Sequence, residues 1–156
     1  QNGDADLLLK VLKNPAYPGW GYMLANGATT VWERWEKENK STMNSFDHPM
    51  FASYDWIFYH YVLGIKIDDV FHNEVRLEPA FPESLQEASG SLLTPRGEIE
   101  VSYHKQEDGI ALRLFVPLSL QIKAFFPKKK VYLEGREIKQ NPLMLKNGEY
   151  LFLLKE

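Results

Sequence analysis

The spacing of apolar residues changes near residue 70, and this change restricts the folds open to the chain. Before it, apolar side chains recur every three or four positions, as on one face of an amphipathic helix. From Val70 onward they alternate with polar residues, as in strands that bury one face. We therefore predict an α+β chain, with a helical domain at residues 1–68 and a β-domain at residues 69–156.

The helical domain is predicted to contain about three helices. The first spans Asp4 to Lys13, with the aspartate as its cap, and the second spans Pro18 to Gly27, ending through a left-handed residue. The third starts near Asp47, with Pro49 in its first turn, has an apolar face from Tyr54 to Ile65, and has Gly64 as its natural stop. Between them, Thr29 to Trp35 favours an extended run and Lys37 to Ser45 a polar loop.

The β-domain is predicted to be a small antiparallel β-sandwich of about seven short strands. Its turns are marked by Gly97, Asp108-Gly109 and Asn147-Gly148, and Lys128-Lys129-Lys130 is interpreted as a solvated turn. The residues expected to point inward are Val75, Leu77, Ile99, Val101, Tyr103, Ile110, Leu112, Leu114 and Val116.

The helical domain carries more large aromatic residues than three helices normally enclose. The chain also begins with Gln1 and has no basic-then-apolar leader. We therefore expect a fragment, whose partners are the missing upstream helices and whose uncovered apolar faces favour self-association. Whether the parent protein is periplasmic, secreted or cytoplasmic stays open.

Composition argues against several classes of function. A net charge of -3 with no basic stripe argues against nucleic-acid binding, and no apolar stretch approaches the roughly 20 residues of a membrane span. The chain has no cysteine, and its histidines lack ligand spacing, so no metal is expected. Gly19-Trp20-Gly21 lacks the context of a dinucleotide site, and no cofactor is predicted.

The segment from Tyr17 to Trp35 places one carboxylate, that of Glu33, among aromatic rings. Proteins bind pyranoses in this way, with rings against the apolar sugar faces and polar groups on the hydroxyls. Trp32 and Trp35 would raise the pKa of Glu33 by dehydration, and Arg34 would lower it, as a general base near neutral pH requires. The alternative is a salt-bridged glutamate on an aromatic strand.

The same segment resembles the late catalytic domain of the bacterial alpha-L-rhamnosidases, glycoside hydrolase family 78. The matching residues read Tyr-Pro-Gly-Trp-Gly-Tyr-Met from Tyr17 and Gly-Ala-Thr-Thr-Val-Trp-Glu-Arg-Trp from Gly27. Gly90 to Ile99 resembles a turn between strands of the family's C-terminal domain. The resemblance implies the last helices of an (alpha/alpha) six-fold barrel followed by a β-sandwich. It also implies an inverting enzyme in which Glu33 is the general base and the general acid lies upstream of this chain.

The resemblance further implies substrate-binding residues. Asn44 to Phe51 is similar to the element that carries a family histidine, which makes His48 a candidate for sugar hydroxyls, with capping or core packing as the alternative. Asp47 and Ala52 stand where the family more often has asparagine and glycine. The other candidates for sugar contacts are Trp20, Trp32, Arg34 and Trp35, and each tryptophan could equally be core.

We therefore interpret the chain as the C-terminal fragment of an inverting alpha-L-rhamnosidase acting on a rhamnose-containing glycoside or polysaccharide. The fragment alone is expected to be inactive. One alternative is a non-catalytic carbohydrate-binding or structural module that uses sandwich aromatics, for which the candidates are Tyr103, Phe125, Tyr132 and Tyr150. Another is a complete small protein whose aromatic helices bind a partner. The aglycone is not determined by this sequence.

Overall fold

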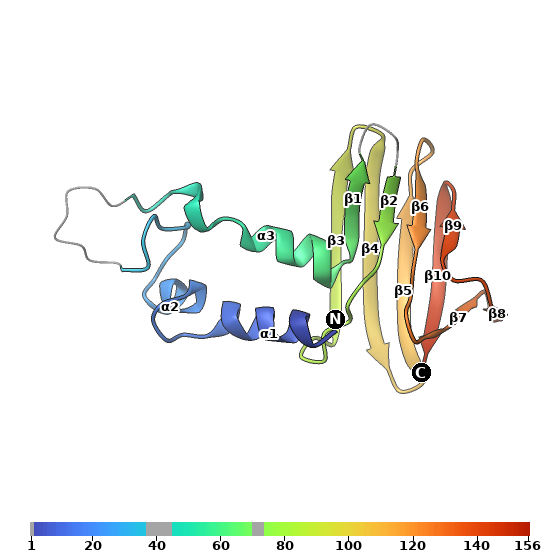
Figure 1. The fold of residues 1–156 in the computed structure, drawn as a ribbon, viewed down its shortest axis with the longest axis horizontal. Helices are drawn as coiled ribbons and strands as arrows, with labels where there is room; N and C mark the ends of the chain where they lie inside the picture. Colours follow the sequence, from blue (N-terminus) through green and yellow to red (C-terminus); the bar gives the residue numbers. More distant parts are fainter. Residues whose placement is uncertain (1, 37–44, 70–73) are drawn as a thin grey trace. The chain divides into compact units, whose positions relative to one another are not determined.

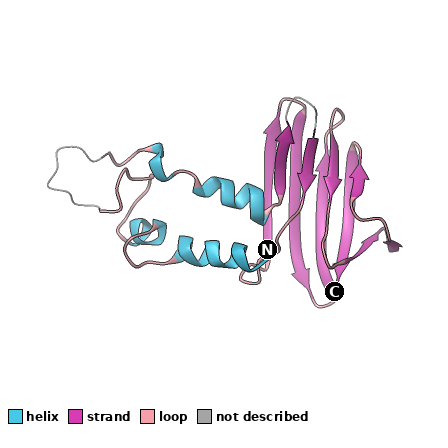
Figure 2. Ribbon diagram, viewed as in Figure 1, coloured by secondary structure: helices cyan, strands magenta, loops and turns pink. Residues whose placement is uncertain are grey.

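The computed structural model describes residues 2–36, 45–69 and 74–156, so the loop predicted from Lys37 lies outside the described residues except at Ser45. Internal contacts divide the chain into two units, Gln1–Ile57 and Phe58–Glu156. Helices dominate the first unit and strands the second (Figure 2). The chain therefore has the mixed α+β class predicted from the change in period, while a boundary after residue 68 stays a prediction.

The first unit contains α1 (Asn2–Lys13), α2 (Trp20–Ala25), the 3₁₀ turn η1 (Pro49–Phe51) and α3 (Tyr54–Ile57). Helix α1 begins two residues before the predicted start, so Asp4 is a helical residue and not the cap. Its apolar residues divide between two environments. Ala5, Leu9 and Leu12 are buried, whereas Leu7 and Val11 remain 60% and 47% exposed.

Helix α2 is shorter than predicted, because it starts at Trp20 after the cap Gly19. It ends as expected, with Gly27 in the left-handed region at a φ of 83°. At Gly21 an added Cβ would lie 2.3 Å from the Asn14 carbonyl oxygen. This position therefore requires glycine, because the chain after α1 passes directly against α2.

The prediction of one continuous helix from Asp47 to the stop at Gly64 is wrong. The structure breaks it into η1, α3 and a π-helical turn, η2 (Phe58–Val62), after which Ile65 begins the first strand. Gly64 stops the helix as predicted and has a φ of 74°. The run predicted to be extended from Thr29 to Trp35 forms bends and irregular structure and does not become a strand of a sheet.

The described part of the second unit contains ten strands in two sheets (Figure 1). The order is β1-β2-β6-β9 in the smaller sheet and β3-β4-β5-β10-β7-β8 in the larger. All strand pairs are antiparallel except β2 and β6, which are parallel. The strands are β1 (Ile65–Asp69), β2 (Glu74–Leu77), β3 (Glu87–Thr94), β4 (Gly97–Gln106), β5 (Gly109–Val116), β6 (Gln121–Ala124), β7 (Lys130–Leu133), β8 (Arg136–Ile138), β9 (Leu143–Leu145) and β10 (Gly148–Lys155).

The core of this sandwich follows the predicted alternation. Burial changes at every residue along β5, and every residue predicted to point inward is buried. Phe126 is fully buried and lies 5.5 Å from the ring of Phe152. Tyr103, one of the aromatic candidates for sugar binding on the sandwich, is only 3% exposed, so that part of the binding-module hypothesis is wrong.

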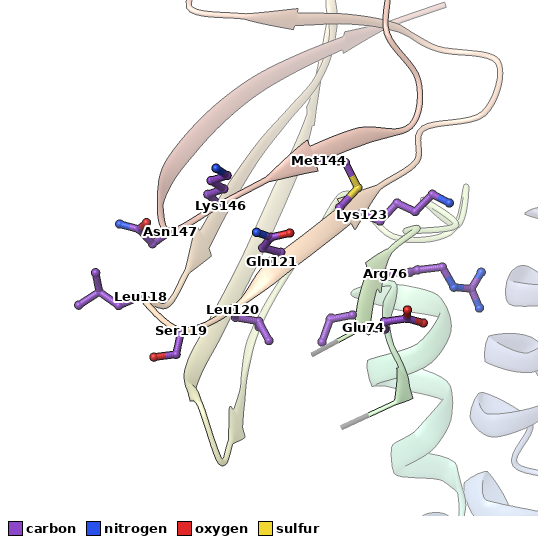
Figure 3. Close-up of a pocket in the computed structure, with 11 residues that line it drawn as sticks. Glu74, Arg76, Leu118, Ser119, Leu120, Gln121, Lys123, Met144, Lys146 and Asn147 are labelled. Carbon is purple, nitrogen blue, oxygen red and sulfur yellow. The ribbon is translucent and has the colours of Figure 1, made fainter. Parts of the chain in front are cut away.

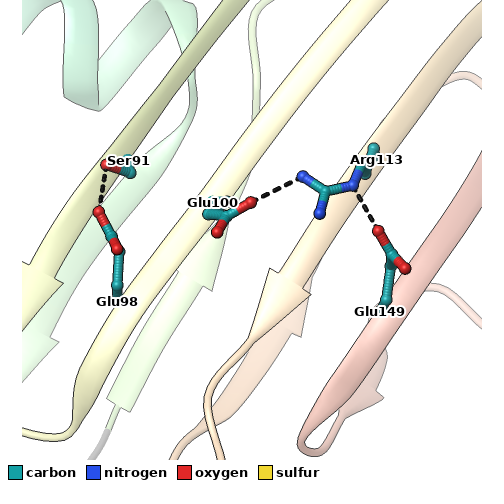
Figure 4. Close-up of polar contacts among 5 residues, drawn as sticks. All are labelled: Ser91, Glu98, Glu100, Arg113 and Glu149. Carbon is teal, nitrogen blue, oxygen red and sulfur yellow. Dashed lines mark hydrogen bonds and ion pairs between the residues drawn. The ribbon is translucent and has the colours of Figure 1, made fainter.

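The outer face of the larger sheet carries an ion-paired network across neighbouring strands (Figure 4). Arg113 on β5 donates to Glu100 on β4 at 2.7 Å and to Glu149 on β10. These two carboxylates raise the pKa of Arg113 through their hydrogen bonds. Ser91 donates to Glu98 at the adjoining strand pair. The face is therefore polar and internally paired, as expected of a sheet surface that contacts water.

We expect Gly64→Ala to destabilise the sandwich unit by about 3 kcal/mol. The new Cβ would lie 2.2 Å from the backbone nitrogen of Pro79, and the positive φ adds strain. Gly135→Ala is the matched control, because Gly135 has a φ of 77° but no atom within 4 Å of an added Cβ. Urea denaturation, monitored by circular dichroism, should show that the control loses only about 1 kcal/mol of its free energy of unfolding. Equal losses would contradict the steric argument.

Candidate active site

The candidate site is built on two chain segments that lie side by side without forming a regular strand pair. The backbone N–H of Glu33 donates to the carbonyl of Ser45 at 2.9 Å, and that of His48 donates to the carbonyl of Val31 at 2.8 Å. These two bonds align residues 31–33 with residues 45–48. The predicted base and the predicted sugar-binding histidine are thereby brought onto adjacent segments.

The carboxylate of Glu33 has a defined anchor. Its Oε2 accepts a hydrogen bond from the backbone N–H of Ser45 at 2.8 Å, and the residue is half-buried. A backbone donor holds a carboxylate in one direction without neutralising it with a cation. The salt-bridge alternative finds no support in the described contacts of Glu33, because its contact partner there is a backbone amide. The arrangement therefore presents a half-buried carboxylate that is held in a fixed direction.

Trp32 directly precedes Glu33 in the sequence, and its side chain is packed into the protein. The residue is 3% exposed, and its ring meets that of Phe46 edge-on at 5.6 Å. Thr30 supports the same segment by donating its hydroxyl to the carbonyl of Phe46. Trp32 therefore contributes packing in this structure, and a direct contact of its ring with a sugar stays a prediction.

The other two tryptophans form an aromatic cluster with residues from η1 and α3. Trp35 stacks on Phe51 with ring centres 3.9 Å apart, and Trp20 meets Trp35 edge-on at 5.3 Å. Trp20 also contacts the ring of Tyr54 and donates its indole N–H to the carbonyl of Phe51 at 2.8 Å. Both tryptophans remain partly exposed, but one face of Trp35 is covered by Phe51. The cluster fixes the chain on both sides of Glu33.

Arg34 has an electrostatic effect on Glu36, whereas the sequence led us to expect an effect on Glu33. It is exposed, and its charge contributes to lowering the pKa of Glu36. The main cause of that lowering is the hydrogen bond that the Tyr17 hydroxyl donates to Glu36, which also raises the pKa of Tyr17. The contact between Glu36 and Tyr17 has no signal in the sequence, because the two residues are 19 positions apart.

His48 caps the 3₁₀ turn that follows it. Its Nδ1 accepts a hydrogen bond from the backbone N–H of Met50 at 3.1 Å. An accepting Nδ1 places the proton of the neutral ring on Nε2. Capping, which the sequence left as the alternative, is thus present in the structure. It leaves the Nε2–H as a donor, so a hydroxyl contact by His48 stays a prediction compatible with the capping role.

We expect His48→Asn and His48→Ala to separate these two roles. Asparagine can accept from Met50 in the same way, whereas alanine cannot, so only the alanine variant should lose about 1 kcal/mol of stability. Both variants lack the Nε2–H donor and should bind L-rhamnose more weakly in the complete enzyme. Thermal melting and calorimetric titration measure the two effects. Normal affinity in both variants would leave His48 as a cap alone.

The candidate site combines the anchored carboxylate of Glu33 with the partly exposed rings of Trp20 and Trp35. Among the described histidines and acids, no group of three or more comes together as a metal site would require. None of the described helices has the length and apolar character needed to cross a membrane. The anchor from Ser45 was missed at the sequence level, because it depends on closure of the loop between residues 33 and 45.

Two family models match successive parts of the chain. Residues 1–62 match the bacterial alpha-L-rhamnosidase 6 hairpin glycosidase domain, and residues 64–140 match the bacterial alpha-L-rhamnosidase C-terminal domain. An alpha-L-rhamnosidase of Alteromonas sp. (strain LOR) is 32% identical over 162 residues, which cover 97% of this chain and 18% of the relative. An alpha-L-rhamnosidase from Formosa agariphila is 29% identical over 161 residues, which cover 99% of this chain and 17% of the relative.

Solved structures agree with these matches. The alpha-L-rhamnosidase of Dictyoglumus thermophilum superposes with a TM-score of 0.82 at 29% identity, covering 95% of this chain and 18% of that one. The Streptomyces avermitilis alpha-L-rhamnosidase complexed with L-rhamnose shares the fold, with a TM-score of 0.80 at 22% identity. The superposition covers 94% of this chain and 16% of that one. This chain thus spans under a fifth of the length of these relatives.

Proposed function

We propose a function from one premise: the chain belongs to the bacterial alpha-L-rhamnosidases, whose two domain models together match residues 1–62 and 64–140. In this proposal the chain forms the end of the catalytic helical barrel and the C-terminal β-sandwich of an enzyme that removes terminal, non-reducing L-rhamnose. The substrate is a rhamnose-containing glycoside or polysaccharide. A relative of the same fold was crystallised with L-rhamnose, which supports this sugar as the ligand.

The observation that carries the proposal is the anchored carboxylate of Glu33. The hydrogen bond from Ser45 fixes the direction of its Oε2, and the residue is half-buried. Such a group can take a proton from one bound water. In an inverting glycosidase that water attacks the anomeric carbon on the face opposite the leaving oxygen.

The proposed reaction divides its protons between two carboxyl groups. Glu33 accepts one proton as the water oxygen bonds to the anomeric carbon, and a second carboxylic acid protonates the departing oxygen as the glycosidic bond breaks. The two groups of an inverting enzyme stand roughly 6.5–9.5 Å apart, which leaves room for the water. Glu36 is not a good second group, because its carboxylate is bound to Tyr17 and its pKa is lowered. We therefore place the acid outside this chain.

The configuration of the first product tests the inverting mechanism. The complete enzyme should release β-L-rhamnose from an aryl α-L-rhamnoside, since a single displacement reverses the anomeric centre. Proton NMR within the first minutes, before mutarotation, distinguishes the anomers. A first product with the α configuration would instead require a covalent intermediate and would overturn the role proposed for Glu33 as a base.

A further inference from the structure

A pocket lies on the outer face of the smaller sheet, in the sandwich unit and apart from Glu33 in the chain (Figure 3). Its volume is about 910 Å³, near the upper end of the range of ligand pockets in proteins. The alternation of β2 and β6 sends Val75 and Ile122 into the core and the intervening side chains into this pocket. The residues used below are Glu74, Arg76, Gln121, Lys123, Lys146 and Asn147.

Cations are concentrated here in an arrangement that costs stability. Strand register places Lys66 opposite Arg76, and Arg76 opposite Lys123, so that three like charges are neighbours across β1, β2 and β6. Like charges directly opposite each other destabilise a sheet. Glu78 offsets part of this repulsion, because it pairs with Lys66 and lies 3.7 Å from Arg76.

Two lysines of the pocket have no such compensation. Within the described residues, neither Lys123 nor Lys146 belongs to an ion pair. Three cations and the single carboxylate of Glu74 give the lining a formal net charge of +2, although the chain as a whole carries -3. A positive pocket on a negative protein attracts anions locally.

The rest of the lining has the chemistry of sugar recognition without aromatic rings. Gln121 and Asn147 carry amides that can both donate to and accept from hydroxyl groups. Leu118 and Met144 are 85% and 57% exposed at the edges of the pocket and offer apolar surface to the face of a pyranose. Combined with the lysines, this lining suits a saccharide that also carries negative charge.

We propose that this pocket binds a saccharide chain containing uronate residues. Lys123 and Lys146 pair with the carboxylates, and the two amides bind ring hydroxyls. The modest charge of +2 matches sugars with single carboxylates better than densely sulfated chains. The site would hold an acidic polysaccharide against the protein independently of hydrolysis, so its failure and the failure of the role proposed for Glu33 can be distinguished.

The test is direct binding to the chain itself. Titration calorimetry with oligogalacturonate should show binding that weakens as salt is raised, because screening reduces attraction between exposed charges. A neutral dextran oligosaccharide of equal length should bind at least about tenfold more weakly, since it lacks charge-assisted hydrogen bonds. Equal binding of the two sugars would overturn the assignment of the lysines.

Matched variants locate the site. Lys123→Gln/Lys146→Gln should raise the Kd for oligogalacturonate about tenfold or more. Lys130→Gln/Lys139→Gln removes the same charge from exposed positions outside the pocket and should leave the Kd unchanged. If the first pair does not fold, Lys146→Gln alone, beyond the end of β9, gives the same comparison.

Four further results would overturn the proposal. Equal loss in the two double variants would show attraction by overall charge only. Tighter, lysine-dependent binding of dextran sulfate would assign the pocket to sulfated chains, and equally tight binding of polyglutamate would assign it to an acidic protein segment. Retained affinity in both double variants would place the saccharide elsewhere.

Discussion

Glu33→Gln in the complete enzyme that carries this chain is expected to lower kcat on an aryl rhamnoside by about 10²–10⁴-fold, the usual cost of losing a general base. The amide keeps the size of the side chain and can still accept from the Ser45 N–H, but it cannot take a proton from the attacking water. The fold should therefore be unchanged while turnover falls. Steady-state kinetics together with thermal melting measure both.

Glu36→Gln is the control for this substitution. It removes a carboxylate three residues away that is bound to Tyr17, and it should leave kcat within a few-fold of the original. Added azide should not produce a rhamnosyl product of retained configuration from the Glu33→Gln enzyme, since no glycosyl–enzyme intermediate is proposed. Near-normal turnover by Glu33→Gln would remove this residue from the mechanism.

The 156-residue chain alone is expected to show no detectable hydrolysis of an aryl rhamnoside. Catalysis requires the base, the acid and the sugar-binding groups to be held in one preorganised pocket. This chain covers only 18% of the Alteromonas relative, and among the described residues we identify no suitable second carboxyl group for the anchored Glu33. A chromogenic assay at high protein concentration, compared with the complete enzyme, tests this expectation.

The same chain should bind a hydrophobic dye or self-associate. Leu7, Val11, Leu24 and Trp56 are between 47% and 69% exposed in the helical unit, more apolar surface than a water-facing helix usually presents. Dye fluorescence and sedimentation measure the two outcomes. A monomeric chain that binds no dye and cleaves the rhamnoside would contradict both expectations.

The division into helices and strands could be predicted from the sequence, because side-chain period is a property of the local backbone. Alternation identified β4 and β5, and Gly27 ended α2 in the predicted conformation. The segment from Tyr17 to Trp35 was sufficient for the family. None of these conclusions required knowledge of which distant residues meet.

The errors and omissions concern contacts between distant residues. Thr29 to Trp35 was predicted to be extended, but it forms bends and no regular ladder; among the described residues it shares two backbone hydrogen bonds with residues 45–48. The π-turn before β1 and the parallel pairing of β2 with β6 are likewise decided by packing.

The candidate site shows the same difference between what the local sequence predicts and what distant contacts decide. The sequence by itself indicated Glu33, its aromatic neighbours and the family whose chemistry they fit. Only the tertiary structure decided that the N–H of Ser45 orients the carboxylate, that Trp32 is core, and that His48 caps a turn. These contacts depend on how the loops bring distant hydrogen-bond donors and rings together. No local sequence pattern relates the residues that loop closure joins.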